Sequence, residues 1–179
     1  VDLGLSVKWA AWNIGATSPE EYGNYYAWGE VEPKADYTNE NYKHANGRYN
    51  YILPDGLSDI SGTKFDAATV NWGNGWRMPT IDEFQELLNN CSWEWTSMNG
   101  VNGYQISGNG NNIFLPAAGC RYYDEMEVRY FSELGAYWSA SLNDKSSTSA
   151  WGFSFEETAI YEKDSVSRYP GSTVRPVKE

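Results

Sequence analysis

A capping box at residues 80–83 is the strongest local signal in this chain, and it fixes where one helix must begin. The Thr80 hydroxyl is placed to accept from the Glu83 amide while the Glu83 side chain returns to the Thr80 amide. Apolar residues then recur at offsets of three and four, which is the spacing of one buried helical stripe: Phe84, Leu87 and Leu88. The sequence therefore predicts a helix from Ile81 to about Asn89.

Beyond Ser92 the pattern changes to period two, which is typical of strands. Asn-Gly and Gly-Asn pairs punctuate this part and predict turns at 99–100, 102–103 and 108–111. We expect strands around 93–95, 104–106, 112–115, 137–140, 150–155 and 173–177, with a first strand within 3–11. Two short helices among a larger number of strands indicate an α+β fold.

The N-terminal half carries weaker signals. Ser18-Pro19-Glu20-Glu21 has an N-cap residue, proline at the first helical position and acids in the first turn, so it predicts a short helix. Residues 29–63 show little periodicity and are expected to form a long loop, either functional or packed by its own aromatic residues. Residues 66–70 suggest a helical turn or two.

Composition bounds the classes of fold and partner. With 16% aromatic residues, 17 Gly and 179 residues in all, the chain suits a single loop-rich domain over 1–179. Its net charge of −11 repels phosphate backbones, so no nucleic-acid partner is expected. No apolar run is long enough for a transmembrane segment and no signal peptide begins at Val1. Cys91 and Cys120 are either one bridge or two thiols, and we favour thiols.

A set of short motifs in order along the chain resembles a known family. The motifs are VDLGLSVKWA at 1–10, YAWGE at 26–30, NWGNGWRMPT at 71–80, LPAAG at 115–119, YWSA at 137–140 and VRPV at 174–177. They are similar to the Fibrobacter succinogenes major paralogous domain family, which is common in secreted and lipid-anchored proteins of gut Bacteroidetes. The resemblance implies a C-type-lectin-like fold with small antiparallel sheets, two short helices, long ligand-binding loops and paired termini.

The same resemblance links the chain to formylglycine-generating-enzyme-like domains and to the variable proteins of diversity-generating retroelements. The enzyme's paired cysteines lie close in sequence, whereas Cys91 and Cys120 are 29 residues apart, so that activity is not carried over. Family members often have a cysteine after the first-strand Trp-Ala, where this chain reads Ala10-Ala11-Trp12. If that cysteine pairs near Cys91 in relatives, the family disulfide is missing here and Cys120 is the remaining candidate partner.

Catalysis is not expected. His44 is the only histidine and lies in a polar loop, so a Ser-His-Asp or Cys-His site would have to use it. The enzymatic alternative is a glycoside-active site of loop carboxylates near Glu30, beside Trp28, since aromatic platforms next to acids bind and cleave sugars. The other acids of this stretch are Glu32, Asp36 and Glu40.

No cofactor is expected, with a structural calcium ion left open. Calcium-dependent lectins use Glu-Pro-Asn or Gln-Pro-Asp together with Trp-Asn-Asp. Here Glu32-Pro33-Lys34 puts an ammonium where a hard cation needs oxygen, whereas Leu142-Asn143-Asp144 keeps two oxygen donors.

Polar residues threaded between aromatic and arginine positions mark the expected ligand face. Residues 143–149 and 161–169 lack apolar alternation and form the expected recognition face, and 156–158 is a further polar stretch. The residues read as scaffold are Trp138, Trp151, Phe153, Phe155, Arg168, Gly171 and Arg175. Loop tyrosines are typical of recognition surfaces; they are Tyr49, Tyr51, Tyr122, Tyr123, Tyr161 and Tyr169. The predicted ligand-binding residues are Asn143, Asp144, Ser146, Trp151, Tyr161, Glu162, Asp164 and Tyr169.

The sequence thus favours a noncatalytic, extracytoplasmic ligand-binding domain of adhesin or receptor-binding type, secreted or anchored at a cell surface. Its expected partner is a protein or glycan on another cell or host surface. Retroelement diversification of the polar segments and a purely structural module within a larger surface protein are the further alternatives.

Overall fold

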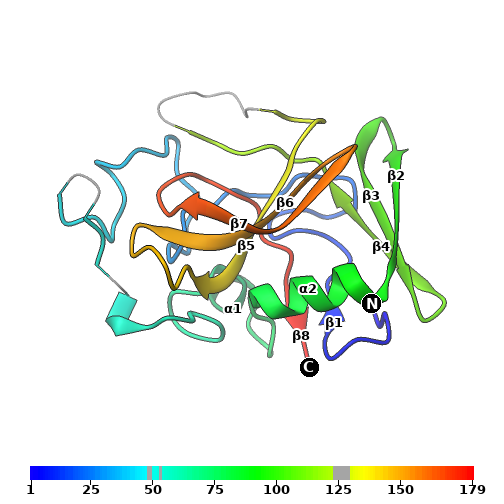
Figure 1. Cartoon of the computed structure of the whole chain (residues 1–179), viewed down its shortest axis with the longest axis horizontal. Helices are drawn as coiled ribbons and strands as arrows, with labels where there is room; N and C mark the ends of the chain where they lie inside the picture. Colours follow the sequence, from blue (N-terminus) through cyan, green and yellow to red (C-terminus); the bar gives the residue numbers. More distant parts are fainter. Residues whose placement is uncertain (48–49, 53, 123–129) are drawn as a thin grey trace.

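The structure is a computed structural model that describes residues 1–47, 50–52, 54–122 and 130–179. It is an α+β arrangement of three small antiparallel sheets with two α-helices, as the sequence predicts (Figure 1). The sheets are β1–β8 (Lys8–Trp9 and Val177–Lys178), β2–β3–β4 (Ser92–Met98, Val101–Gly108 and Asn111–Pro116) and β5–β6–β7 (Gly135–Leu142, Ser149–Glu156 and Ala159–Ser167). In the described part of the chain no helix is both long and apolar enough to span a bilayer.

The first and last strands pair, which confirms that prediction. Trp9 lies opposite Val177, and Lys8 opposite Lys178, in an antiparallel ladder. The regular strands are shorter than expected, but the pairing continues irregularly because Ala10 donates to the Pro176 carbonyl at 2.9 Å and Ile14 to the Val174 carbonyl at 3.1 Å.

Helix α2 (Ile81–Asn90) begins at the predicted residue. The Thr80 hydroxyl accepts from the Glu83 amide at 3.2 Å, and the Glu83 carboxylate accepts from the Thr80 amide at 2.8 Å. Arg77 binds the same carboxylate through both terminal nitrogens, at 2.6 and 2.9 Å. Burial by itself raises the pKa of Glu83, but the hydrogen bonds and charge of Arg77 and the Thr80 amide outweigh it and hold the pKa below its ordinary value.

The second helix, α1 (Ala67–Trp72), is capped by a buried acid. One carboxylate oxygen of Asp66 accepts from the amides of Ala68 and Thr69, and the other accepts from Gly62 and Met78. The short 3-10 helix η1 (Pro54–Gly56) interrupts the long loop.

Two of the predicted local features are wrong. Residues 18–21 form a turn and not a helix, because the Glu21 carboxylate folds back to accept from the Thr17 amide at 2.6 Å. Asn102-Gly103 lies inside β3, where a Cβ on Gly103 would meet the Leu115 carbonyl oxygen at 2.2 Å. That glycine serves close strand packing, whereas Asn99-Gly100 and Asn109-Gly110 make the expected hairpin turns with positive φ at both residues.

The core joins α2 to both larger sheets. Phe84 of α2 stacks on Phe153 of β6 with ring centroids 4.7 Å apart, and Trp9 lies 5.1 Å from Phe84. Figure 1 shows α2 running along the β5–β6–β7 sheet, with β2–β3–β4 at one end of it. A second cluster surrounds Trp28 and Trp138, both buried.

The long loop is packed by its own aromatic residues, one of the two expected explanations for its length. Tyr37, Tyr42 and Tyr51 from this loop form a buried cluster with Tyr25 and Tyr169. Trp9 and Trp138 are buried, whereas four other tryptophans are half-buried: Trp72, Trp76, Trp93 and Trp95.

Two arginines, both fully buried, tie these loops together. Arg168 donates to the Tyr42 hydroxyl and to the carbonyls of Ser147 and Ile52, and its guanidinium lies 4.9 Å from the centre of a Trp28 ring. This bonding confirms Arg168 as a scaffold residue.

Arg175 plays the same part at the other end of the fold. Its guanidinium donates to the carbonyls of Ala10, Ala11 and Phe114 and to the Asn13 side-chain oxygen, at 2.8 to 3.1 Å. Burial, which disfavours the charged form, lowers the pKa of Arg175 to about 10.

We predict that Thr80→Ala lowers the free energy of unfolding by about 1 kcal/mol, because the Glu83 amide loses its capping partner. Chemical denaturation measures the change, and Ser97→Ala on the exposed part of β2 is the control that should change little. A Thr80→Ala variant as stable as the parent would mean that the cap contributes nothing.

Arg175→Leu should cost more than about 3 kcal/mol or prevent folding, since it leaves several buried oxygen acceptors without a donor. The matched control is Lys163→Leu on β7, which is exposed and should stay within about 0.5 kcal/mol of the parent. Thermal and denaturant unfolding test both, and equal stability of the two variants would contradict the role given to Arg175.

Candidate ligand-binding pocket

The predicted site at residues 143–149 is a tightly bonded turn. Asn143 is 4% exposed, donates to the Ser165 hydroxyl at 2.7 Å and accepts from the Lys145 amide at 2.9 Å. Ser146 pairs with the Thr148 hydroxyl at 3.0 Å, and Asp144 is exposed. The assignment of Asn143 as an available ligand-binding side chain is therefore wrong: its amide shapes the turn.

The remaining predicted residues divide between surface and core. Tyr161 and Glu162 are exposed, but they lie on β7, a strand that the sequence did not reveal. Asp164, also on β7, accepts from the Ser154 hydroxyl at 2.6 Å, and Trp151 on β6 is half-buried. Tyr169 is 8% exposed and packs within the tyrosine cluster.

The other loop tyrosines do not form one face. Tyr51 is 5% exposed and Tyr122 packs against the tyrosine cluster. Tyr49 and Tyr123 lie outside the described residues.

The β6–β7 hairpin also separates the segments predicted to act together. Residues 143–149 lie at its open end, whereas 156–158 form its tip, about 25 Å away at the rise of an extended strand. The tip, unlike the open end, borders a pocket.

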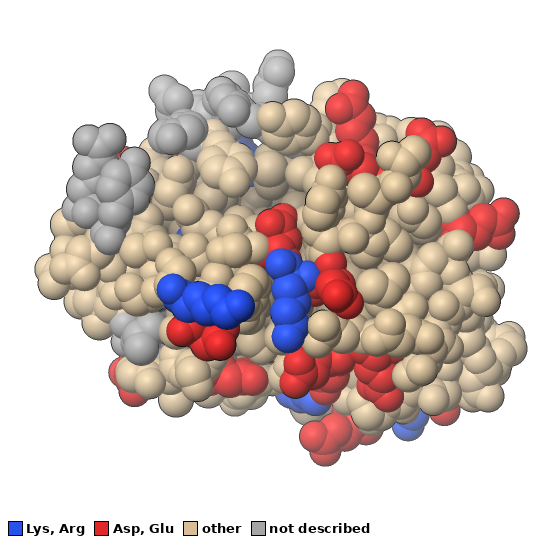
Figure 2. Space-filling model, viewed as in Figure 1, with Lys and Arg blue, Asp and Glu red and all other residues tan. Residues whose placement is uncertain are grey.

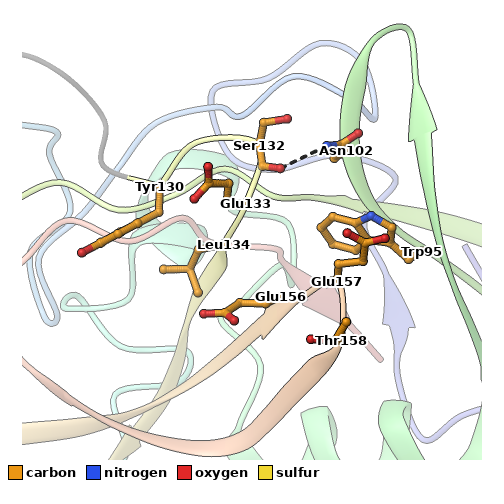
Figure 3. A pocket seen from close by; sticks show the side chains of 9 residues that line it. All are labelled: Trp95, Asn102, Tyr130, Ser132, Glu133, Leu134, Glu156, Glu157 and Thr158. Atoms are coloured by element: carbon orange, nitrogen blue, oxygen red, sulfur yellow. Dashed lines mark hydrogen bonds between the residues drawn. The ribbon is translucent and has the colours of Figure 1, made fainter.

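This pocket has a volume of about 510 Å³, within the usual range for small-ligand sites. Three segments line it: β2–β3, residues 130–134 and the β6–β7 tip. In Figure 3, Trp95 and Tyr130 lie on opposite sides, with Glu133, Leu134 and Glu156 between them. The lining residues are Trp95, Asn102, Tyr130, Ser132, Glu133, Leu134, Glu156, Glu157 and Thr158.

Strand β3 holds both rims of the pocket. The Tyr104 hydroxyl donates to the carbonyls of Glu156 and Glu157, at 3.3 and 3.1 Å, and so anchors the β6–β7 tip. Asn102 lies two residues away on the same face of the strand, and its side-chain amide donates to the Ser132 carbonyl at 3.2 Å (Figure 3). Trp95 stands opposite Tyr104 in the ladder, with the two rings 5.2 Å apart.

The rim at 130–134 is a turn held in an uncommon conformation. Tyr130 and Ser132 have φ of 55° and 64°, a left-handed region that costs side-chain-bearing residues roughly 1–2 kcal/mol each. The Leu134 amide donates to the Tyr130 carbonyl at 2.9 Å and the Ser132 amide to Ala117 at 2.7 Å. This geometry leaves Tyr130 57% exposed and Phe131 62% exposed, beside a shallower hollow of about 430 Å³ that continues the pocket.

Three acidic side chains line the pocket. Within the described residues, Glu133, Glu156 and Glu157 make no ion pair or side-chain hydrogen bond, and no Lys or Arg lines the pocket. Acidic side chains also spread over the face shown in Figure 2, with few basic ones among them. The site therefore combines aromatic surface with acceptors that have no partner among the residues the structure describes.

The sequence pointed to one side of this pocket only. The polar stretch at 156–158 can be recognised in the sequence, whereas nothing in the local pattern marks Trp95 or residues 130–134 as pocket walls. Their convergence depends on two hairpins meeting, which no local pattern reports.

Glu30, the central residue of the enzymatic alternative, is a buried carboxylate that bonds to its own loop. Glu30 is 2% exposed, lies 3.0 Å from the Lys34 ammonium and accepts from the Lys43 amide at 2.8 Å. Glu32 is exposed and pairs with Lys43. Glu30 therefore stabilises the loop around it.

His44 packs between the rings of Tyr42 and Phe65, and its Nε2 lies 3.0 Å from the Gly29 carbonyl. Burial, which disfavours the imidazolium, lowers the pKa of His44. A donated hydrogen bond to Gly29 and a neutral ring indicate a packing role.

Among the described residues no three His, Cys, Asp or Glu side chains cluster as metal ligands. Cys91 is a free, half-buried thiol and Cys120 is buried, so the two are not bridged.

Comparison with protein-family models, with curated proteins and with solved structures found no match for this chain. The pocket's own chemistry therefore carries the functional argument.

We predict that Glu30→Gln lowers the free energy of unfolding by about 3 kcal/mol, because the largely buried Lys34 ammonium loses its counter-charge. Glu32→Gln is the matched control and should change stability by less than about 0.5 kcal/mol, since its ion pair with Lys43 is exposed. Denaturant titrations of both variants decide; a fully stable Glu30→Gln protein would free Glu30 for a functional role.

Proposed function

We propose that this chain is a noncatalytic, extracytoplasmic ligand-binding domain of C-type-lectin-like fold, and that it takes its ligand in the pocket between β2–β3 and the β6–β7 tip. The observation that carries the proposal is the pairing of aromatic surface, Trp95 and Tyr130, with carboxylates that have no partner among the described residues. Interface sites use such rigid aromatic anchors beside polar groups that fix orientation.

The architecture supports this fold proposal. Paired terminal strands, small antiparallel sheets, two helices and a long packed loop are what the family resemblance implies. The ligand is proposed to reside on another cell or host surface.

Binding without turnover is supported by the side chains that a reaction would need, because they are already engaged in contacts within the protein. The single histidine and the central acid of the glycosidase alternative both serve packing and ion pairing. The bonded turn at 143–149 argues against unrestricted exchange of its side chains, because replacing Asn143 would leave Ser165 and Lys145 without their partner.

A matched pair of double variants tests where the ligand binds. Tyr130→Asn with Glu156→Gln alters the pocket, and asparagine suits the left-handed backbone at 130. Tyr161→Asn with Glu162→Gln makes the same chemical changes on exposed β7.

Both variants and the parent are applied to arrays of neutral and sialylated glycans and of basic and acidic peptides. We expect the pocket variant to weaken the parent's strongest interaction by about tenfold or more, the equivalent of 1.4 kcal/mol, and the β7 variant to bind normally. The reverse result would move the site to β7. Hydrolysis of an arrayed glycan would contradict the noncatalytic proposal.

A further inference from the structure

The charge balance of the pocket narrows the class of ligand. Glu133, Glu156 and Glu157 bring three carboxylates to one hollow whose described lining contains no cationic side chain. Neutral hydroxyl groups could hydrogen-bond to these oxygens but would leave their negative charge unbalanced, whereas a cation would offset it. An anionic ligand would be repelled by all three.

The aromatic walls favour the same class. Positive groups bind over aromatic faces, and Trp and Tyr are the strongest such surfaces. In the described part of the chain no Lys or Arg stacks on Trp95 or Tyr130, although other rings are used in this way: Lys34 on Tyr37, Lys64 on Phe65 and Lys178 on Trp76.

Arg168 is an example within this protein of a cation held by aromatic rings and oxygen atoms. Its guanidinium lies 4.9 Å from Trp28 and 5.5 Å from both Tyr42 and Tyr51, with carbonyl oxygens completing the shell. The pocket offers a comparable aromatic and oxygen environment, with carboxylates in place of carbonyls and with no internal cation among the described residues.

The geometry points to an ammonium or guanidinium group as the ligand of this pocket, held between Trp95 and Tyr130 and neutralised by the three glutamates. This inference rests on the proposed binding function and specifies its chemistry. Lysine or arginine side chains displayed by a protein, and free polyamines, are the two sources of such a group. The net charge of −11 adds long-range attraction, so association should weaken as salt rises.

The test uses four probes: capped tetralysine, the same peptide with every side-chain amine acetylated, spermidine and the neutral sugar cellotetraose. Calorimetry and the change in tryptophan emission report binding. We expect tetralysine to bind at least about tenfold more tightly than its acetylated form, since acetylation removes both the charge and the cation–π contact. Tighter binding of tetralysine than of spermidine assigns the source to a protein, and the opposite order assigns it to a free polyamine.

Two triple variants separate local from general electrostatics. Glu133→Gln, Glu156→Gln and Glu157→Gln remove the pocket charges, while Glu32→Gln, Glu40→Gln and Glu162→Gln remove the same charge from exposed sites elsewhere. Thermal unfolding checks that both fold. The pocket triple should lose tetralysine binding and the control should retain it.

Equal loss in both triples, or equal binding of acetylated and free tetralysine, would overturn the inference. Cellotetraose binding that depends on Tyr130, without binding of either cation, would overturn it while leaving the proposed binding function standing. Binding of no probe here and of no arrayed ligand in the preceding experiment would overturn both.

Discussion

Two buried guanidinium groups, neither with a carboxylate partner in the described part of the chain, join the loops of this fold. Arg168 binds carbonyls of Ser147 and Ile52, and Arg175 binds carbonyls near residue 10 and in β4, so each joins segments far apart in sequence. Removing such a charge from water is costly, and several charge-assisted hydrogen bonds together with aromatic contacts offset the cost. Irregular loops have few backbone ladders of their own, so their carbonyls need these donors.

This bonding scheme explains why a loop-rich chain can present a preorganised site. The loop at 29–63 is packed on its own tyrosines. Strand β3 then acts as a common base, since Asn102 fixes one rim and Tyr104 the other. The pocket side chains can thus change without disturbing the core, with the exception of Trp95, which also packs on Tyr104 and Phe155.

An exposed side chain does not by itself belong to a pocket, as β7 shows. Tyr161 and Glu162 are exposed on β7 but do not line the pocket. Glu156 and Glu157 line it, beside aromatic rings. Conversely, a polar side chain in a polar segment can be engaged within the protein: the Asn143 side chain hydrogen-bonds within and beside its own turn. Polarity in a sequence therefore marks both ligand groups and turn formers.

The sequence alone determined features whose causes lie within a few residues. The capping box at Thr80 and the Asn-Gly turns at 99–100 and 109–110 follow from local hydrogen bonding and allowed φ. It failed at residues 18–21 and at Gly103, where a side chain folding back and a neighbouring strand decided the conformation. Tertiary structure alone decided that Tyr51 and Tyr169 are buried and that Trp95, Tyr130 and Glu156 line one pocket, because burial and convergence depend on segments that the chain brings together only when it folds.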